Sequence, residues 1–295
     1  SYSVTGVQTC ALPISISLRS FLSASWLGWK IESNWTEPFL FVIYSIIKPL
    51  AGAGILVLMY SIVTDQNFTN PMFAYLYLGN AFYHYVPAVL SGISYTIIDD
   101  REHYRTLKYI YIAPVNIPLY LFGRGVAQFL TGSFAVLITL LVGFLFLNVP
   151  FDIHQVNWPL FIFSLILGII MLALLGLILA GITLITARHS YFIGDVVASG
   201  LFLFTGAVFP LEVLPAWLRP VGYALPITYW LELIRRSLVG NIASAFPTFS
   251  SMSNFDLILV LIVTSFIASM IAIFLFNKCD HTARERGLID MSTNY

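Results

Sequence analysis

The sequence predicts an all-α polytopic membrane protein. Of its 295 residues, 59% are hydrophobic and only 9% are charged, and the mean hydropathy is +0.87. A soluble domain carries about a quarter charged residues, so this chain would expose a large apolar surface in water. Disorder is excluded because apolar residues dominate nearly everywhere. Fourteen Lys and Arg balance fourteen Asp and Glu, which excludes a broad basic face for nucleic acid.

The N-terminal run Val4–Ile14 differs in kind from the rest of the chain. It resembles the translation of a sequencing-adapter oligonucleotide over eleven consecutive residues, and the chain does not begin with Met. A secretory signal is a poorer interpretation, because no basic segment precedes the run and Pro13 interrupts it. We therefore expect residues 1–15 to be an artefact outside the native fold. Without Cys10, the remaining Cys279 forms neither a disulfide framework nor a thiolate metal site.

Residues 16–37 precede the first long apolar segment. Within them, Ser23–Glu37 carries three tryptophans around Lys30: Trp26, Trp29 and Trp35. Tryptophan rings favour headgroup depth, and a lysine extends its ammonium group toward water. We expect an amphipathic helix that lies on the inner membrane interface.

Six apolar segments between residues 38 and 277 satisfy the requirement of about 20 residues for a membrane-crossing helix. They are Phe39–Val63, Pro71–Ile98, Ile117–Leu147, Trp158–Ile185, Phe192–Phe209 and Phe255–Phe276. We therefore predict six transmembrane helices in a membrane domain over residues 38–277, followed by a tail over residues 278–295.

The placement of basic residues predicts the orientation. With both termini in the cytoplasm, the cytoplasmic side holds Arg19, Lys30, Arg101, Arg105, Lys108, Arg124, Arg188, Lys278, Arg284 and Arg286. The opposite side holds only Arg219, Arg235 and Arg236. Because basic residues concentrate on the cytoplasmic side, both termini are expected there.

The segment Pro210–Ser253 is apolar but contains five prolines. Each proline interrupts the helical hydrogen-bond ladder, so we expect short re-entrant helices on the external side before the last span. Glu232 has the spacing for an i,i+3 or i,i+4 ion pair with Arg235 or Arg236. That pair is better explained as structural than as a substrate contact.

The charged segment between the second and third predicted spans, Asp99–Pro114, is the most informative. As one helix, it would place Tyr104, Leu107 and Tyr111 on an apolar face. A second face would carry Arg101, Arg105 and Lys108. From these residues alone, a linker with a solvated charged face remains an alternative.

Two segments resemble the permeases of ABC type-2 transporters. Arg101-Glu102, followed by Thr106-Leu107 and Ala113-Pro114, resembles their coupling-helix region. Gly206–Leu218 and Leu225–Arg235 resemble their external re-entrant segment. The similarity extends over roughly Trp29–Leu288 with the same order of spans. Arg105 and Lys108 depart from the family pattern, which often has Gly and Glu there.

The resemblance implies a transport subunit in a prokaryotic inner or plasma membrane. Such permeases form homodimers or heterodimers on two separate ABC ATPase subunits, and this chain has no G-x-x-x-x-G-K-[ST] phosphate-binding loop of its own. No cofactor is expected, because the partner subunits bind ATP. The residues implied to couple the permease to the ATPase are Arg101, Glu102, Tyr104, Arg105, Leu107 and Lys108. The cargo implied is an amphipathic drug, lipid or lipid-linked glycan.

Other polar residues allow further interpretations. Tyr77, Asn80 and His84 lie near one stripe of the second span and could line a substrate pathway, although ordinary interhelical packing is preferred. Lys48 and Asp195 are ionisable residues within spans, and Asp195 could pair with Arg188. An ion-coupled secondary carrier is therefore the alternative function.

Catalytic and metal sites receive no support from the sequence. The five histidines lack ligand spacing, and no H-E-x-x-H or G-x-S-x-G motif occurs. We expect neither an enzyme nor a metal site.

Overall fold

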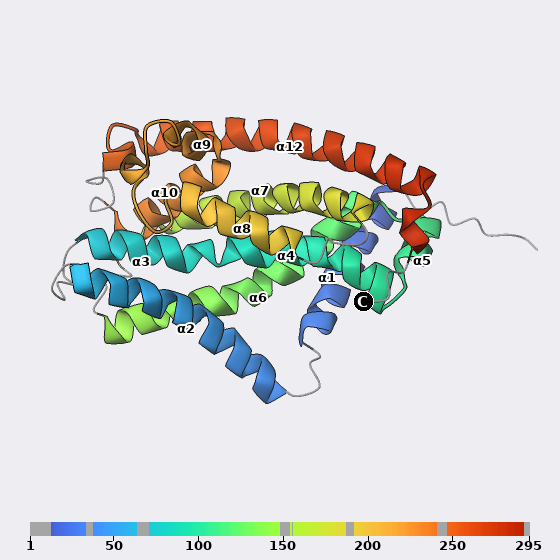
Figure 1. The fold of residues 1–295 in the computed structure, drawn as a ribbon, viewed down its shortest axis with the longest axis horizontal. Coiled ribbons are helices and arrows are strands. Elements are labelled where there is room, and N and C mark those ends of the chain that lie inside the picture. The colour runs from blue at the N-terminus through green and yellow to red at the C-terminus, as the bar shows by residue number, and fades with distance from the viewer. Residues whose placement is uncertain are drawn as a thin grey trace, which may run out of the picture.

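The computed structural model describes residues 13–33, 38–63, 71–147, 154, 156–186, 192–240 and 247–291. Within these ranges the chain is helical and contains no strand. Helices α1, α5 and the C-terminal end of α12 lie at one end of an elongated bundle, and α9 and α10 lie at the other (Figure 1).

The N-terminal half contains α1 (Pro13–Ser33), α2 (Pro38–Val63), α3 (Pro71–Tyr83), α4 (Tyr85–Ile98), the π-helix η1 (Asp99–His103), α5 (Leu107–Ile112) and α6 (Ile117–Phe146). The C-terminal half contains α7 (Trp158–Ile185), α8 (Ile193–Phe204), η2 (Leu211–Val213), α9 (Arg219–Ala224), α10 (Pro226–Val239), η3 (Pro247–Phe249), α12 (Asn254–Glu285) and η4 (Leu288–Asp290).

Three of the described helices, α6, α7 and α12, are long and apolar enough to cross a membrane. Their most apolar windows have mean hydropathies of 2.3, 3.0 and 2.8. Shorter apolar helices span Pro49–Ile62 and Ile193–Phe204. Large apolar side chains on α6 and α12 are exposed, among them Phe144 and Phe266. Such outward surfaces are stable against lipid, where burial inside the protein is not required.

The core joins α10 to α7 through close packing. Trp230 on α10 is fully buried, and its indole Nε1 donates a 2.9 Å hydrogen bond to the carbonyl of Ser164 on α7. Gly168 allows this approach, because a Cβ atom there would lie 2.0 Å from the indole nitrogen. The tryptophan is therefore positioned both by its hydrogen bond and by the missing side chain opposite it.

The second predicted span, Pro71–Ile98, is divided at His84 into α3 and α4, and this division was not predicted from the sequence. Pro87 has no N–H to donate to the carbonyl of Tyr83, which weakens the ladder at this point. His84 nevertheless keeps right-handed helical angles, with φ −56° and ψ −25°. The chain therefore continues in the same direction through the interruption.

The fifth predicted span, Phe192–Phe209, was too long at its C-terminal end. Helix α8 contains twelve residues and ends at Phe204, which corresponds to about 18 Å. Arg235 on α10 donates to the carbonyls of Gly206 and Ala207, at 2.7 and 3.4 Å. Gly206 has a positive φ of 70°, so the backbone leaves the helix where these carbonyls turn toward the arginine.

The proline-rich segment forms short helices, as predicted. Prolines 220 and 226 lie in the first turns of α9 and α10, where the missing N–H does not break a helical hydrogen bond.

Candidate functional site

The segment Arg101–Ile112 does not form the single helix that the sequence predicted. The π-helix η1 ends at His103, and α5 begins only at Leu107. Between them, Arg105 adopts a φ of +53°, in the left-handed region that favours glycine. The amide of Thr106 donates to the Asp100 carbonyl at 2.7 Å, which stabilises this turn. The predicted helical faces are therefore wrong, because they required uninterrupted helical spacing.

Two of the predicted coupling residues point into the bundle. Leu107 is only 2% exposed and belongs to the main hydrophobic core. The buried guanidinium of Arg101 lies 3.4 and 3.5 Å from the carbonyls of Thr183 and Leu184, at the C-terminal end of α7. A cation is stabilised there by the helix dipole. Arg101 also pairs with Glu102 at 3.5 Å, so these residues attach the segment to α7.

The outer face of the same segment consists of other residues. Tyr109 is 64% exposed and Ile112 is 80% exposed, and Tyr104 and Arg105 are also exposed. We call Tyr104, Arg105, Tyr109 and Ile112 the outer face of α5. Sequence reasoning missed Tyr109 and Ile112, although their i,i+3 spacing in a charged segment was a usable signal.

Contacts with the C-terminal region support α5 from the other side. The phenol of Tyr111 donates a 2.6 Å hydrogen bond to Asp280 on α12, and burial raises its pKa. The guanidinium of Arg284 lies over the same ring, 4.8 Å from its centre. Lys108 pairs with Asp290 at 3.3 Å. Thus α5 is connected to α12 and η4 by side chains that are distant in sequence.

Two carboxylates of η1, Asp99 and Asp100, lie directly before the segment Arg101–Ile112 and were not selected from the sequence. Burial raises the pKa of Asp99 and of Asp100, while Arg124 acts in the opposite direction on both. Asp100 also accepts a 2.7 Å hydrogen bond from the Tyr120 phenol. Because both carboxyl groups are desolvated, the η1 region is sensitive to their protonation.

Of the three predicted pathway residues, two are buried inside the protein and one lines a cavity. The Tyr77 phenol donates to the Thr139 carbonyl at 2.6 Å, and Asn80 is buried. His84 alone of the three lines a cavity of about 500 Å³. The cavity is also lined by Glu32, Pro49, Pro87, Ala88, Ser91, Gly92, Tyr95, Asp99, Gln128, Gly132, Ala135 and Asp195.

Asp195 lies in this cavity with two hydroxyl partners. Ser91 and Tyr95 donate to its carboxylate at 2.8 and 2.6 Å. Its predicted partner Arg188 and the side chain of Lys48 lie outside the described residues.

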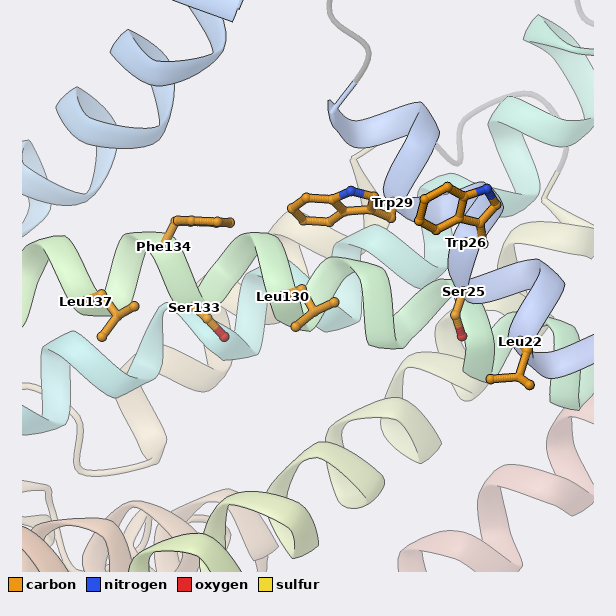
Figure 2. Close-up of a pocket in the computed structure, with 8 residues that line it drawn as sticks. All are labelled: Leu22, Ser25, Trp26, Trp29, Leu130, Ser133, Phe134 and Leu137. Atoms are coloured by element: carbon orange, nitrogen blue, oxygen red, sulfur yellow. The ribbon is translucent and has the colours of Figure 1, made fainter. Parts of the chain in front are cut away.

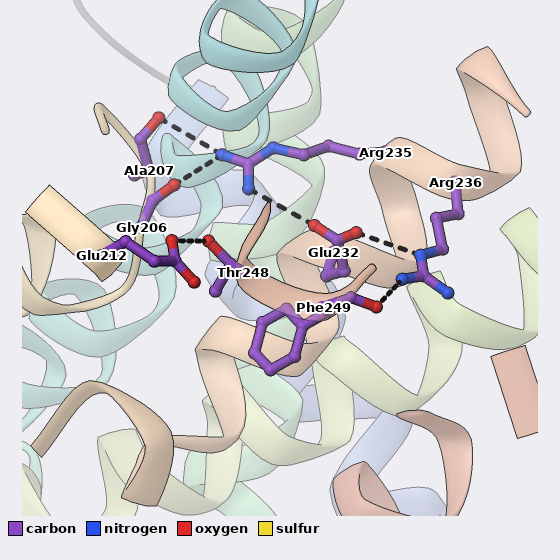
Figure 3. A network of polar contacts seen from close by, with 8 residues as sticks. All are labelled: Gly206, Ala207, Glu212, Glu232, Arg235, Arg236, Thr248 and Phe249. Atoms are coloured by element: carbon purple, nitrogen blue, oxygen red, sulfur yellow. Dashed lines mark hydrogen bonds and ion pairs between the residues drawn. The ribbon is translucent and has the colours of Figure 1, made fainter. Parts of the chain in front are cut away.

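The opposite end of the bundle contains the predicted Glu232 ion pair, which is confirmed (Figure 3). Glu232 lies 3.0 Å from Arg236 and 3.9 Å from Arg235. Arg236 also donates to the carbonyls of Phe249 and Met252, at 2.6 and 2.7 Å. All three charged side chains are buried, so this network fastens α10 to its neighbours.

A search of curated proteins found no match. The sequence model of the family described as ABC-2 type transporter matches residues 20–239, which include α5, the cavity and the charged residues of the Glu232 network. With its long apolar helices, the protein is a multi-pass membrane protein. Because the match covers most of the chain, the protein belongs to the ABC-2 type transporter family.

Proposed function

We propose that this chain is the permease subunit of an ATP-driven exporter, powered by two separate ABC ATPase subunits that bind the ATP. Members of this family normally work with ABC ATPase partners. A dimer of permeases, either identical or different, would provide the membrane pathway. The membrane would be the plasma or inner membrane of a prokaryote.

The proposed topology has six crossings with both termini in the cytoplasm. The crossings are α2, α3 with α4, α6, α7, α8 with its flanking residues, and α12. The end of the bundle that carries α1 and α5 then faces the cytoplasm (Figure 1), in agreement with the distribution of basic residues. The short helices α9 and α10 would be re-entrant on the external side.

The outer face of α5 is the observation that carries this proposal. Exposed apolar side chains on a short, well-anchored helix can be buried in a cleft of a partner, and Arg105 adds charge selectivity. The anchors described above, Arg101 and Tyr111, would pass force from this face to α7 and α12. The earlier assignment of Leu107 to the partner contact is replaced by Tyr109 and Ile112, because Leu107 is covered by the protein itself.

The cavity around Asp195 supports an amphipathic cargo. Its walls combine carboxylates with prolines and alanines, so polar and apolar parts of one molecule would both find partners. The proposed cargo is an amphipathic drug, lipid or lipid-linked glycan.

The test is reconstitution with the ATPase encoded beside this gene or co-purified with it. The purified chain alone should hydrolyse no ATP, and the complex should couple hydrolysis to export. Replacement of Ile112 by Asp should reduce ATPase co-purification and transport by tenfold or more, by analogy with buried interface anchors worth about 2 kcal/mol. Trp217→Asp is the matched control, because Trp217 is 76% exposed near the opposite end of the bundle. Equal loss in both variants, or none in either, would refute this surface as the ATPase contact.

A further inference from the structure

An apolar groove lies between α1 and α6, away from the outer face of α5. Its volume is about 510 Å³, and it is lined by Leu22, Ser25, Trp26, Trp29, Leu130, Ser133, Phe134 and Leu137 (Figure 2). The Trp29 and Phe134 rings stack across the two helices with centres 6.3 Å apart. The size is within the range of about 300–1,000 Å³ that holds small ligands in proteins.

Small residues fix the position of α1 beside α6. A Cβ atom on Gly123 would lie 2.7 Å from the Phe21 carbonyl, and one on Gly28 would lie 2.8 Å from the Ala127 methyl. Neither helix can therefore move closer, and the bulkier side chains of the groove form its walls. The groove is a product of rigid helix packing and does not depend on a flexible loop.

One end of the groove carries positive charge. Trp26 is 63% exposed, and the ammonium of Lys30 lies over its ring at 5.0 Å. Arg19 is exposed three turns earlier on α1, about 16 Å from Lys30 along the helix. Glu32 is the only acidic residue of α1, and its carboxylate accepts a 2.6 Å hydrogen bond from Gln128 on α6. The exposed face of α1 therefore presents cations without a competing carboxylate.

The other end of the groove continues into a lipid-like surface. Leu130, Phe134, Leu137 and Leu141 are exposed at helical spacing along α6. Because α6 is one of the helices able to cross a membrane, this stripe faces hydrocarbon. A ligand in the groove would thus meet cations and an indole at one end and an apolar helix face at the other.

We propose that the groove between α1 and α6 binds an anionic phospholipid. The phosphate lies beside Lys30, Arg19 adds a longer-range attraction from about 16 Å along α1, and an acyl chain follows Leu130, Phe134 and Leu137. The charge of α1 selects an anionic over a zwitterionic headgroup. A second copy of the chain would cover the apolar walls equally well, but it would not require these cations at the end of the groove.

The test uses the purified chain in nanodiscs, without an ATPase, so its result is independent of the proposed transport function. Phosphatidylglycerol or phosphatidylcholine, brominated on the acyl chains, is added at equal mole fraction to quench tryptophan fluorescence. The contribution of Trp26 is the difference between wild type and Trp26→Phe. We expect brominated phosphatidylglycerol to quench it at a lower mole fraction, by about fivefold for each contributing cation.

The variants separate a selective site from general lipid contact. Lys30→Gln should lose about fivefold of the preference, and Lys30→Gln with Arg19→Gln should abolish it. Arg286→Gln is the matched control, because it removes an exposed cation directly after α12, at the same end of the bundle. Phosphatidylglycerol should also raise the melting temperature of wild type and of Arg286→Gln, but not of the double variant.

Several results would overturn the proposal. Equal quenching by the two lipids would leave only general lipid contact. A preference that persists in the double variant would place the selectivity elsewhere. If neither lipid quenches Trp26, and cysteines introduced at Trp26 cross-link two chains, the groove is an interface between copies.

Discussion

The Tyr111 phenol on α5 donates a 2.6 Å hydrogen bond to the Asp280 carboxylate on α12, across 169 positions of sequence. Arg284, one turn further along α12, donates to the other oxygen of the same carboxylate at 3.0 Å and covers the tyrosine ring. Helix α5 is therefore tied to the C-terminal part of α12, the longest helix described. A displacement of α5 would be transmitted to α12 through this three-residue contact.

Replacement of Tyr111 by Phe tests this contact. The variant keeps the ring beneath Arg284 but removes the hydrogen bond to a charged acceptor, which should reduce stability by about 1.5–3 kcal/mol. In the reconstituted complex, transport per ATP hydrolysed should fall while ATPase co-purification is retained. The control Tyr223→Phe alters a partly exposed phenol on α9 and should leave the melting temperature and the coupling ratio unchanged. A normal coupling ratio in Tyr111→Phe would remove α12 from the coupling route.

Replacement of Gly168 by Ala should disrupt the packing of α10 on α7. The added Cβ would lie 2.0 Å from the Trp230 indole nitrogen, so Trp230 must shift and lose its hydrogen bond. We expect a destabilisation of about 1–3 kcal/mol, as for other overpacked cores. The control is Gly200→Ala on α8, where no atom lies within 4 Å, and helix propensity should make it neutral or slightly stabilising. Thermal unfolding in detergent compares the two, and equal melting temperatures would contradict the packing argument.

Single and double substitutions in the Glu232 network should change the free energy of unfolding by amounts that do not add. Arg236→Met leaves the buried Glu232 carboxylate with Arg235 at 3.9 Å as its remaining ion pair, which should reduce stability by about 3–5 kcal/mol. With Glu232→Leu in the same chain, the loss should be smaller than the sum of the two single losses, because each single change already breaks the Glu232–Arg236 pair. Chemical denaturation in mixed micelles measures both. Strictly additive losses would show that the two charges do not stabilise one another.

The buried carboxyl of Asp100 predicts a pH dependence of stability. Burial raises its pKa above the ordinary value of 3.8 in the folded protein. The folded state therefore holds the proton more tightly, and this stabilisation is lost as pH rises from about 3.8 through the raised pKa. Asp100→Asn keeps an acceptor for Tyr120 but removes the charge, so it should be more stable than wild type at pH 8. The difference in melting temperature should vanish near pH 4, and a constant difference at both pH values would contradict this assignment.

The long apolar helices and the family could be predicted from the sequence. The predicted Trp158–Ile185 agrees with α7 at both ends, and Ile117–Leu147 differs from α6 by one residue. These limits follow from local chemistry, because polar residues and prolines end an apolar run wherever it lies in the fold. The pairing of Glu232 with Arg236 was predictable for the same reason, since four residues along a helix place two side chains together.

The inward or outward direction of the side chains in Arg101–Ile112 could not be predicted in this way. Leu107 and Tyr109 lie two positions apart, yet one is in the core and the other is exposed. Their difference depends on the turn at Arg105 and on the C-terminal carbonyls of α7, which attract Arg101 across more than 80 positions of sequence. The end of α8 likewise depends on Arg235 of another helix. Hydropathy and periodicity describe a segment by itself, whereas burial and helix termination here depend on hydrogen-bond partners that only the folded chain brings near.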